Sequence, residues 1–401
     1  MSDHILFPKS SSLVRFNTTK LLSPFDDQLC AFVDALSHKL MASFRDNYPD
    51  LFALGYWFRK AHVQEIKQQF FDRSLSFQVR PAGNVFQISP GNVDTLFLYS
   101  GLLALLMGNR VAIRISSKQS DQLDSLIALL NSFIEGTRYQ EVSHRLFVFV
   151  SDHDSAIISD LSRNCDVRVL WGSDQGIEAI RREGLSAKAK DISFPERVSC
   201  CLISAEEVLN TRDLGPLISD FTKDIHSFSQ QACSSPKCLI WQGESKIVEK
   251  AREKFWSLVN SYTDTNPFTR SPSELMQKKI SLQAMALSAP VKIIDEQHAI
   301  SRAFVDINNI NVGLLKMNQG HGLLLETQIN ELEELTNCLC EHFQTLAYWG
   351  FQRVKLLNNL TNSEGVLLNF DRVEVIGKSL EFNIIWDGYD LLHEFCKVIR
   401  N

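Results

Sequence analysis

The stretch Arg110-Val-Ala-Ile-Arg-Ile115 and the segments on either side of it decide the fold of this 401-residue chain. Between residues 85 and 203, short apolar runs alternate with segments of helical periodicity. Strands are expected over 85–89, 110–115, 145–150, 166–171 and 199–203, with helices over 95–107, 122–133, 155–163 and 175–183. Because these strands are apolar on both faces, they predict a parallel, doubly wound α/β sheet that is covered by helices. Such a sheet binds ligands at the carboxyl ends of its strands.

The second half of the chain has a less regular pattern. Residues 214–228 and 245–259 are expected to be helical, and residues 238–241 are expected to form a strand. Weaker strand signals occur at 304–307 and 312–315, and the region 332–350 is predicted to be a helix that runs into a turn. This pattern predicts a second α/β unit.

The composition excludes several classes of protein. The net charge of −6 argues against broad nucleic-acid binding, which needs a basic surface. Nine scattered cysteines with no CxxC pair indicate thiols in a reducing cytoplasm, and they argue against a disulfide framework or a metal site. The N-terminus lacks the pattern of a secretory signal. The longest apolar run, Leu96 to Met107, is too short for a membrane helix, which needs about 20 residues.

Two loops carry residues suited to acyl chemistry. Cys233 lies in Phe228-Ser-Gln-Gln-Ala-Cys-Ser-Ser-Pro236, where small and polar neighbours leave its sulfur accessible, so it is a candidate nucleophile. A single cysteine can equally be a small buried apolar residue. Asn92, in the turn Pro90-Gly-Asn92, can donate its amide to an oxyanion or simply make a local turn hydrogen bond. The residues alone leave these alternatives open.

Two further strand ends suit a phosphate. Gly172 and Ser173 stand between a strand and a helix, where they can admit a pyrophosphate or form an ordinary helix start. Arg114 is followed by Ser116-Ser-Lys118, a set of donors that suits a phosphate but also fits a solvated strand end. No GxGxxG fingerprint accompanies them.

In order along the chain, several of these segments resemble the aldehyde dehydrogenase superfamily. The resemblance is to its acyl-CoA reductase branch, the LuxC-like fatty-acid reductases. It rests on residues 48–59, 88–93, 108–116, 171–174, 228–236 and 385–390. It implies an aldehyde-dehydrogenase-like fold with N-terminal helices and an NADP-binding domain over 1–204, and a catalytic domain with the C-terminal segment over 205–401. It also implies an oligomerisation strand at about 73–82.

The resemblance also assigns roles to residues. It implies that Cys233 forms an acyl thioester and that the Asn92 amide completes an oxyanion hole. Arg114 matches a lysine that contacts the adenine ribose, and Ser117 replaces a glutamate that would repel a 2′-phosphate, so NADPH is expected over NADH. The expected cofactor-binding residues are Ser89, Pro90, Arg114, Ser116, Ser117, Lys118, Gly172 and Ser173.

Two departures from the superfamily pattern matter for the reaction. The segment Gly172 to Gly176 is one residue shorter than the usual Gly-Ser-x-x-x-Gly, and Ser193 falls where the superfamily has its general-base glutamate, with Glu196 nearby but out of register. Without that base, activation of water is disfavoured, whereas exchange with a thiol needs little help.

The expected activity is therefore reduction of an acyl thioester, a long-chain fatty acyl group, to the aldehyde. The donor is acyl-CoA or an acyl-protein, and an acyl-protein synthetase or acyl carrier protein is a candidate partner. Two alternatives remain: an aldehyde dehydrogenase that oxidises an aldehyde, and a non-catalytic relative that serves such a partner. The strand near residue 75 is expected to pair with a neighbouring subunit in a homodimer or tetramer.

Overall fold

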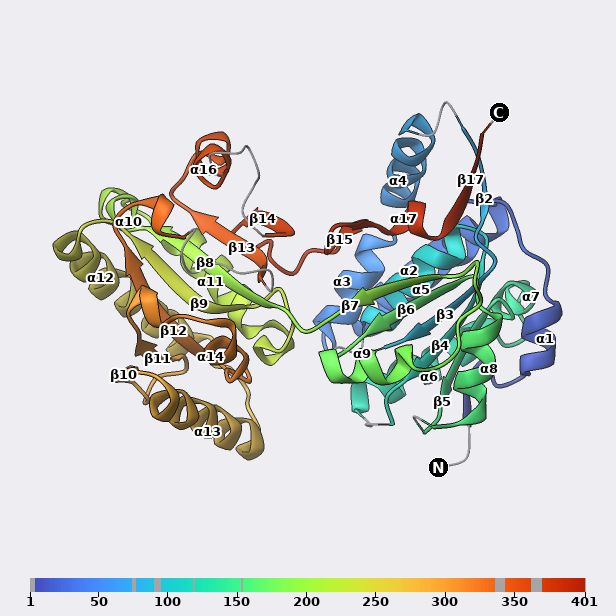
Figure 1. The fold of residues 1–401 in the computed structure, drawn as a ribbon, viewed down its shortest axis with the longest axis horizontal. Coiled ribbons are helices and arrows are strands. Elements are labelled where there is room, and N and C mark those ends of the chain that lie inside the picture. Colours follow the sequence, from blue (N-terminus) through green and yellow to red (C-terminus); the bar gives the residue numbers. More distant parts are fainter. Residues whose placement is uncertain are drawn as a thin grey trace. The chain divides into compact units, whose positions relative to one another are not determined.

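The computed structural model describes residues 4–73, 77–89, 95–117, 120–152, 154–335, 343–361 and 370–400. They form two compact units, the first made of residues 1–195 and 382–401 and the second of residues 196–381 (Figure 1).

The first unit is built on a six-stranded sheet in the order β1-β5-β4-β3-β6-β7. Only β1 is antiparallel to its neighbour in this sheet. The strands are β1 (His4–Phe7), β3 (Asn84–Ile88), β4 (Arg110–Ile115), β5 (Leu146–Val150), β6 (Val167–Trp171) and β7 (Lys190–Phe194). The order of the parallel strands reverses direction at β3, with β4 on one side of it and β6 on the other. This is the topological switch point at which doubly wound sheets bind ligands.

Alternate residues of these strands enter two separate apolar clusters, so both faces of the sheet are buried. Val111 and Ile113 join one cluster, while Ala112 of the same strand joins the other. The larger cluster includes α2 (Asp27–Phe44), α3 (Pro49–Trp57), α4 (Lys60–Arg73), α5 (Leu96–Leu106) and α6 (Asp121–Ile134). The smaller cluster includes α1 (Leu13–Thr18), α8 (Ala156–Asn164) and α9 (Asp174–Arg181). The short helix α7 (Gln140–Ser143) precedes β5. The expected doubly wound sheet is thus confirmed.

A two-stranded ribbon extends from this unit. It pairs β2 (Phe77–Pro81) antiparallel with β17 (Cys396–Arg400), as Figure 1 shows near the C-terminus. The strand expected to pair with a neighbouring subunit therefore pairs within its own chain. The C-terminal segment that leads to it contains β15 (Ile385–Trp386), β16 (Tyr389–Asp390) and α17 (Leu391–Glu394). Leu391, Leu392 and Phe395 are fully buried in the core of the first unit.

The second unit has a seven-stranded sheet in the order β10-β11-β12-β9-β8-β13-β14, in which only β10 is antiparallel. The strands are β8 (Val198–Ser204), β9 (Pro236–Gln242), β10 (Lys292–Asp295), β11 (Ser301–Phe304), β12 (Leu323–Ile329), β13 (Phe343–Trp349) and β14 (Arg372–Val375). The α-helices are α10 (Ala205–Asn210), α11 (Gly215–His226), α12 (Ser245–Thr265), α13 (Pro272–Ser288), α14 (Val312–Lys316) and α16 (Arg353–Asn359). Short 3₁₀ helices are η1 (Ser227–Gln230), η2 (Ile307–Asn309) and η3 (Leu332–Glu334).

The structure divides the chain at a different place from the boundary expected after residue 204. β8 pairs with β9 and β13 of the second sheet, so the second unit begins at Glu196. The C-terminal segment belongs to the first unit because its apolar side chains are buried there. Three local predictions are wrong: the strand expected over 304–307 ends at Phe304, residues 312–316 are helical, and the predicted helix over 332–350 contains β13.

Candidate functional site

Cys233 lies in the turn that joins η1 to β9, immediately before the amino end of that strand, and is half-buried. Its carbonyl oxygen accepts a hydrogen bond of 2.7 Å from Ser199 Oγ in β8, and the Ser199 hydroxyl also accepts from the Thr345 backbone N–H at 3.1 Å. A hydrogen bond of 3.0 Å from Ser235 N to Ala232 O closes the turn around the cysteine. The backbone of Cys233 is therefore attached to a central strand of the second sheet.

The turn before Cys233 has a strained backbone. Phe228, Ser229 and Gln230 have φ angles of 53°, 50° and 61°, in the left-handed region that residues with a side chain rarely adopt. Each such residue costs on the order of 1–3 kcal/mol, and such strain persists only where the surroundings impose it. Strain of this kind concentrates at functional sites, which makes the turn notable beside a candidate nucleophile.

The side chain of Gln230 supplies the constraint. It is fully buried, and its amide nitrogen donates to Pro236 O at 2.7 Å and Leu323 O at 2.9 Å. Its amide oxygen accepts from Gly322 N at 2.9 Å and Leu323 N at 3.1 Å. Both donors and both acceptor positions of the amide are thus satisfied. Gln230 ties the strained turn to β9 and to the segment before β12.

Lys237 and His321 are among the titratable groups that adjoin this turn. The buried Lys237, in β9, donates from Nζ to the Gln230 carbonyl oxygen, and burial lowers its pKa to about 8, against the opposing effects of Cys233 and Glu196. His321 donates its backbone N–H to Ser229 O at 2.7 Å. Burial also lowers the pKa of the His321 imidazole. Neither residue was singled out from the sequence, although Lys237 directly follows the cysteine motif.

Four other thiols, those of Cys30, Cys165, Cys201 and Cys396, are poor nucleophiles. Burial raises the pKa of Cys165 to about 12 and that of Cys396 to about 11, and it also raises the pKa of Cys30 and Cys201. These four thiols stay protonated near neutral pH, and a protonated thiol is a weak nucleophile. This favours Cys233 over them as the reactive cysteine.

The expected cofactor-binding residues lie at the carboxyl edge of the first sheet. Ser89 follows β3 and donates its backbone N–H to Arg114 O in β4 at 3.0 Å. Ser116 and Ser117 follow β4, while Gly172 and Ser173 follow β6 on the other side of β3. The structure therefore brings six of the eight predicted residues to the switch point. Pro90 and Lys118 lie outside the described residues, as does Asn92.

This edge offers donors suited to a phosphate-bearing nucleotide. The buried Arg114 donates from Nη2 to the Ser151 carbonyl oxygen at 3.0 Å, and burial lowers its pKa while Asp152 opposes that effect. The buried Ser151 hydroxyl has no hydrogen-bond partner among the described residues. A Cβ added to Gly172 would meet no atom within 4 Å, which leaves room after β6. These features fit a dinucleotide cofactor.

Ser193 and Glu196 are not equivalent in the structure. Ser193 lies in β7 of the first unit, where its hydroxyl accepts from Arg181 Nη2 at 2.9 Å. Glu196 is exposed at the start of the second unit, close enough to Lys237 to affect the pKa of that amine.

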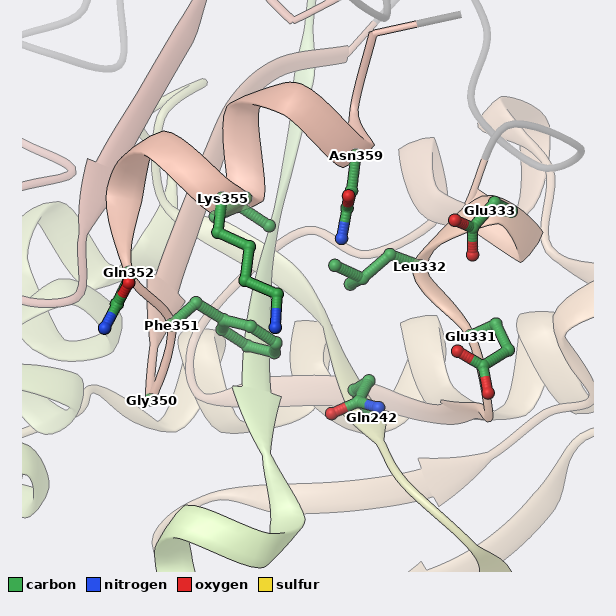
Figure 2. Close-up of a pocket in the computed structure, with 10 residues that line it drawn as sticks. Gln242, Glu331, Leu332, Glu333, Gly350, Phe351, Gln352, Lys355 and Asn359 are labelled. Atoms are coloured by element: carbon green, nitrogen blue, oxygen red, sulfur yellow. The ribbon is translucent and has the colours of Figure 1, made fainter.

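A separate hollow of about 380 Å³ lies at the carboxyl ends of strands in the second sheet (Figure 2). Gln242 at the end of β9 lines it, together with Phe351 and Lys355, whose side chain extends over the Phe351 ring. Cys233 precedes the opposite end of β9, and a seven-residue strand is about 20 Å long. This hollow is therefore not the pocket of the candidate nucleophile.

One family model matches more than half of the chain. The sequence profile of the family described as acyl-CoA reductase (LuxC) matches residues 64–304. A search of curated proteins gives no match.

The described helices include none that is both long and apolar enough to cross a membrane.

Solved structures of aldehyde dehydrogenases resemble the whole chain. Aldehyde dehydrogenase 21 from Physcomitrella patens, in complex with its product succinate, has a TM-score of 0.63 at 12% identity, covering 94% of this chain and 85% of that one. Glyceraldehyde-3-phosphate dehydrogenase GapN from Methanocaldococcus jannaschii, complexed with NADP, has a TM-score of 0.61 at 13% identity, with coverages of 96% and 88%. Lactaldehyde dehydrogenase from Escherichia coli has a TM-score of 0.60 at 13% identity, with coverages of 93% and 84%. The chain has an aldehyde-dehydrogenase-like α/β fold.

Proposed function

Because the chain belongs to the acyl-CoA reductase (LuxC) family, we propose that it reduces a long-chain fatty acyl thioester to the aldehyde, with NADPH and an acyl intermediate on Cys233. Its family and fold place it among enzymes of aldehyde redox chemistry. The observation that carries the assignment to Cys233 is the strained, fully constrained turn that holds this half-buried thiol at the amino end of β9.

The Cys233 thiolate attacks the carbonyl carbon of the thioester, and a new carbon–sulfur bond forms as the carrier thiolate leaves. The backbone N–H of Cys233 and the Asn92 amide donate to the carbonyl oxygen as it becomes negative. When bound, NADPH supplies the hydride that reduces the acyl group. The oxygen of the reduced carbon then re-forms the carbonyl as the bond to Cys233 breaks, which releases the aldehyde and regenerates the thiolate.

Ser193, which falls where the superfamily has its general-base glutamate, supports reduction over hydrolysis. Ser193 accepts a hydrogen bond from Arg181, so its hydroxyl lies beside a cation. A neutral hydroxyl beside a cation is a poor base near neutral pH. Water is then not activated to hydrolyse the acyl-cysteine, and the acyl group persists until hydride transfer.

The preference for NADPH rests on the charge at the edge of the first sheet. Arg114 is a donor for a 2′-phosphate, and Ser117 brings no negative charge against it. Ser89, Ser116, Gly172 and Ser173 would hold the rest of the cofactor, together with Pro90 and Lys118, which lie outside the described residues.

The ribbon of β2 and β17 supports self-association into a homodimer or tetramer. Val398 and Ile399 in β17 are 52% and 41% exposed, which is unusual for apolar residues in a strand. Light scattering of the purified protein tests this proposal, and a monomer at micromolar concentration would contradict it.

The function is tested by measuring aldehyde formed from acyl-CoA substrates of increasing chain length with NADPH. We expect long chains to be reduced, and we expect Cys233→Ala to abolish the reaction. Oxidation of added aldehyde to the free acid, with no reduction of any thioester, would indicate a dehydrogenase instead. An inactive protein that still binds an acyl-protein synthetase or carrier protein would indicate a non-catalytic partner.

A further inference from the structure

We propose that Lys237 is the positioning residue that holds Cys233 as a thiolate, through the positive charge that its ammonium group places beside the cysteine turn. The inference rests on the proposed role of Cys233 and adds a second residue to that site. Lys237 acts on the sulfur through its charge and does not contact the reacting carbon.

The anchoring of the ammonium group is the first support. Lys237 is buried, and its Nζ donates to the carbonyl oxygen of Gln230, a residue whose own side chain is fixed by four hydrogen bonds. Gln230 precedes Cys233 by three residues, and three residues of extended chain span at most about 11 Å. The ammonium group is therefore held on the same short turn that carries the Cys233 sulfur.

The surroundings of Lys237 are the second support. The charged and titratable groups that influence it come from three other segments: Cys233 on the turn, Glu196 at the start of the second unit, and His321 before β12. A thiolate at Cys233 raises the pKa of Lys237, and by reciprocity the ammonium stabilises that thiolate. The exposed carboxylate of Glu196 also favours the charged amine, whereas burial lowers its pKa to about 8.

The pH dependence of this stabilisation follows from the pKa of Lys237, which is about 8. Lys237 carries its charge below about pH 8 and loses it above. Stabilisation of the thiolate by Lys237 is therefore present at neutral pH and fades in alkali. A nearby opposite charge lowers the pKa of an acid by about 1–3, so removal of the charge should cut the thiolate fraction at pH 7 at least about tenfold.

A matched control exists in the same unit. Lys278 is also buried, burial also lowers its pKa to about 8, and its Nζ lies 3.4 Å from a backbone carbonyl oxygen, that of Ala299. The groups that act on Lys278 are Arg270, Asp295 and Lys279, not Cys233. Loss of a buried lysine can thus be separated from loss of the charge beside the cysteine.

The experiment measures alkylation of Cys233 by iodoacetamide from pH 5 to pH 10, without substrate or cofactor, by mass spectrometry of the peptide that contains it. We expect Lys237→Met to react about tenfold more slowly than wild type at pH 7, and to approach wild type above pH 8. Lys237→Arg should retain most of the reactivity at pH 7, and Lys278→Met should match wild type.

A Lys237→Met profile that coincides with wild type, or an equal loss in Lys278→Met, would overturn the proposal. If Lys237→Met does not fold, the wild-type profile alone decides: a midpoint well below about 8.5, the value of a free thiol, is expected, and a midpoint at or above it contradicts the proposal. The proposed function can fail independently of this proposal. In that case the alkylation profile of Cys233 is as expected, but no acyl group is transferred from acyl-CoA to Cys233.

Discussion

Asp224 should make the second unit less stable as the pH rises from about 4 to about 6. This carboxyl group lies in α11 and is only 1% exposed. Its Oδ2 accepts hydrogen bonds of 2.7 Å from Gly377 N and from Ser379 Oγ, while its Oδ1 has no hydrogen-bond partner among the described residues. Burial raises its pKa from 3.8 to about 6, although these two hydrogen bonds and the charge of Lys223 lower it.

The magnitude follows from linkage between proton binding and folding. Between pH 4 and pH 6 the folded protein binds a proton at Asp224 more tightly than the unfolded chain does, so stability falls as the pH rises through this range. Below it both states are protonated, and above it both are ionised. A gap of about 2 pKa units, at about 1.36 kcal/mol each, corresponds to about 3 kcal/mol.

Urea unfolding of wild type and Asp224→Asn at pH 4 and at pH 7 measures this effect. Asparagine cannot ionise, yet its oxygen can still accept from Gly377 and Ser379. The variant should therefore gain about 2 kcal/mol relative to wild type between the two pH values, because the unfolded carboxyl is already partly ionised at pH 4. Asp264→Asn, at an exposed position of α12, is the control and should show no such change. A difference between Asp224→Asn and wild type that stays constant with pH would refute the reasoning.

Three further predictions concern the core and the two candidate sites. Glu326→Ala should destabilise the second unit by about 3–5 kcal/mol in urea unfolding, because Glu326 is fully buried and accepts from two indole N–H groups and two arginines; a loss below about 1 kcal/mol would contradict this. Gly320→Ala should slow aldehyde formation at least about tenfold, since the new Cβ would lie 2.7 Å from Ser229 O and 2.9 Å from Gln230 O and displace the strained turn; unchanged kinetics would argue against a role for that turn. Arg114→Ala should raise the KM for NADPH about tenfold or more and leave the KM for NADH nearly unchanged, and an equal change in both would remove the assignment of Arg114 to the 2′-phosphate.

The first sheet was predictable because its strands are short, apolar on both faces and separated by helices with clear periodicity. The second sheet was harder to predict. Phe343–Trp349 was assigned to a helix because a buried parallel strand and a buried helical segment have similar apolar content. The first sheet has one such exception, the edge strand Lys190–Phe194, which was missed because it carries two charged residues and a serine. In both cases the pairing with a neighbouring strand decides the structure, and the sequence does not show it.

Within the candidate site, the sequence identified the cysteine but not what holds it. Cys233 stands in a recognisable motif, whereas Gln230 acts through bonds to Gly322 and Leu323, more than 90 positions away. The left-handed backbone at Phe228 could not be predicted because no glycine or asparagine marks it. Such contacts depend on the tertiary fold.

The most direct test of the central claim is the mass of the Cys233 peptide after incubation with a long-chain acyl-CoA in the absence of cofactor. We expect one acyl group to be added to Cys233. Hydroxylamine should remove this group, as it does from a thioester, and NADPH should release it as the aldehyde. An unmodified Cys233, or an acyl group on another cysteine, would contradict the account.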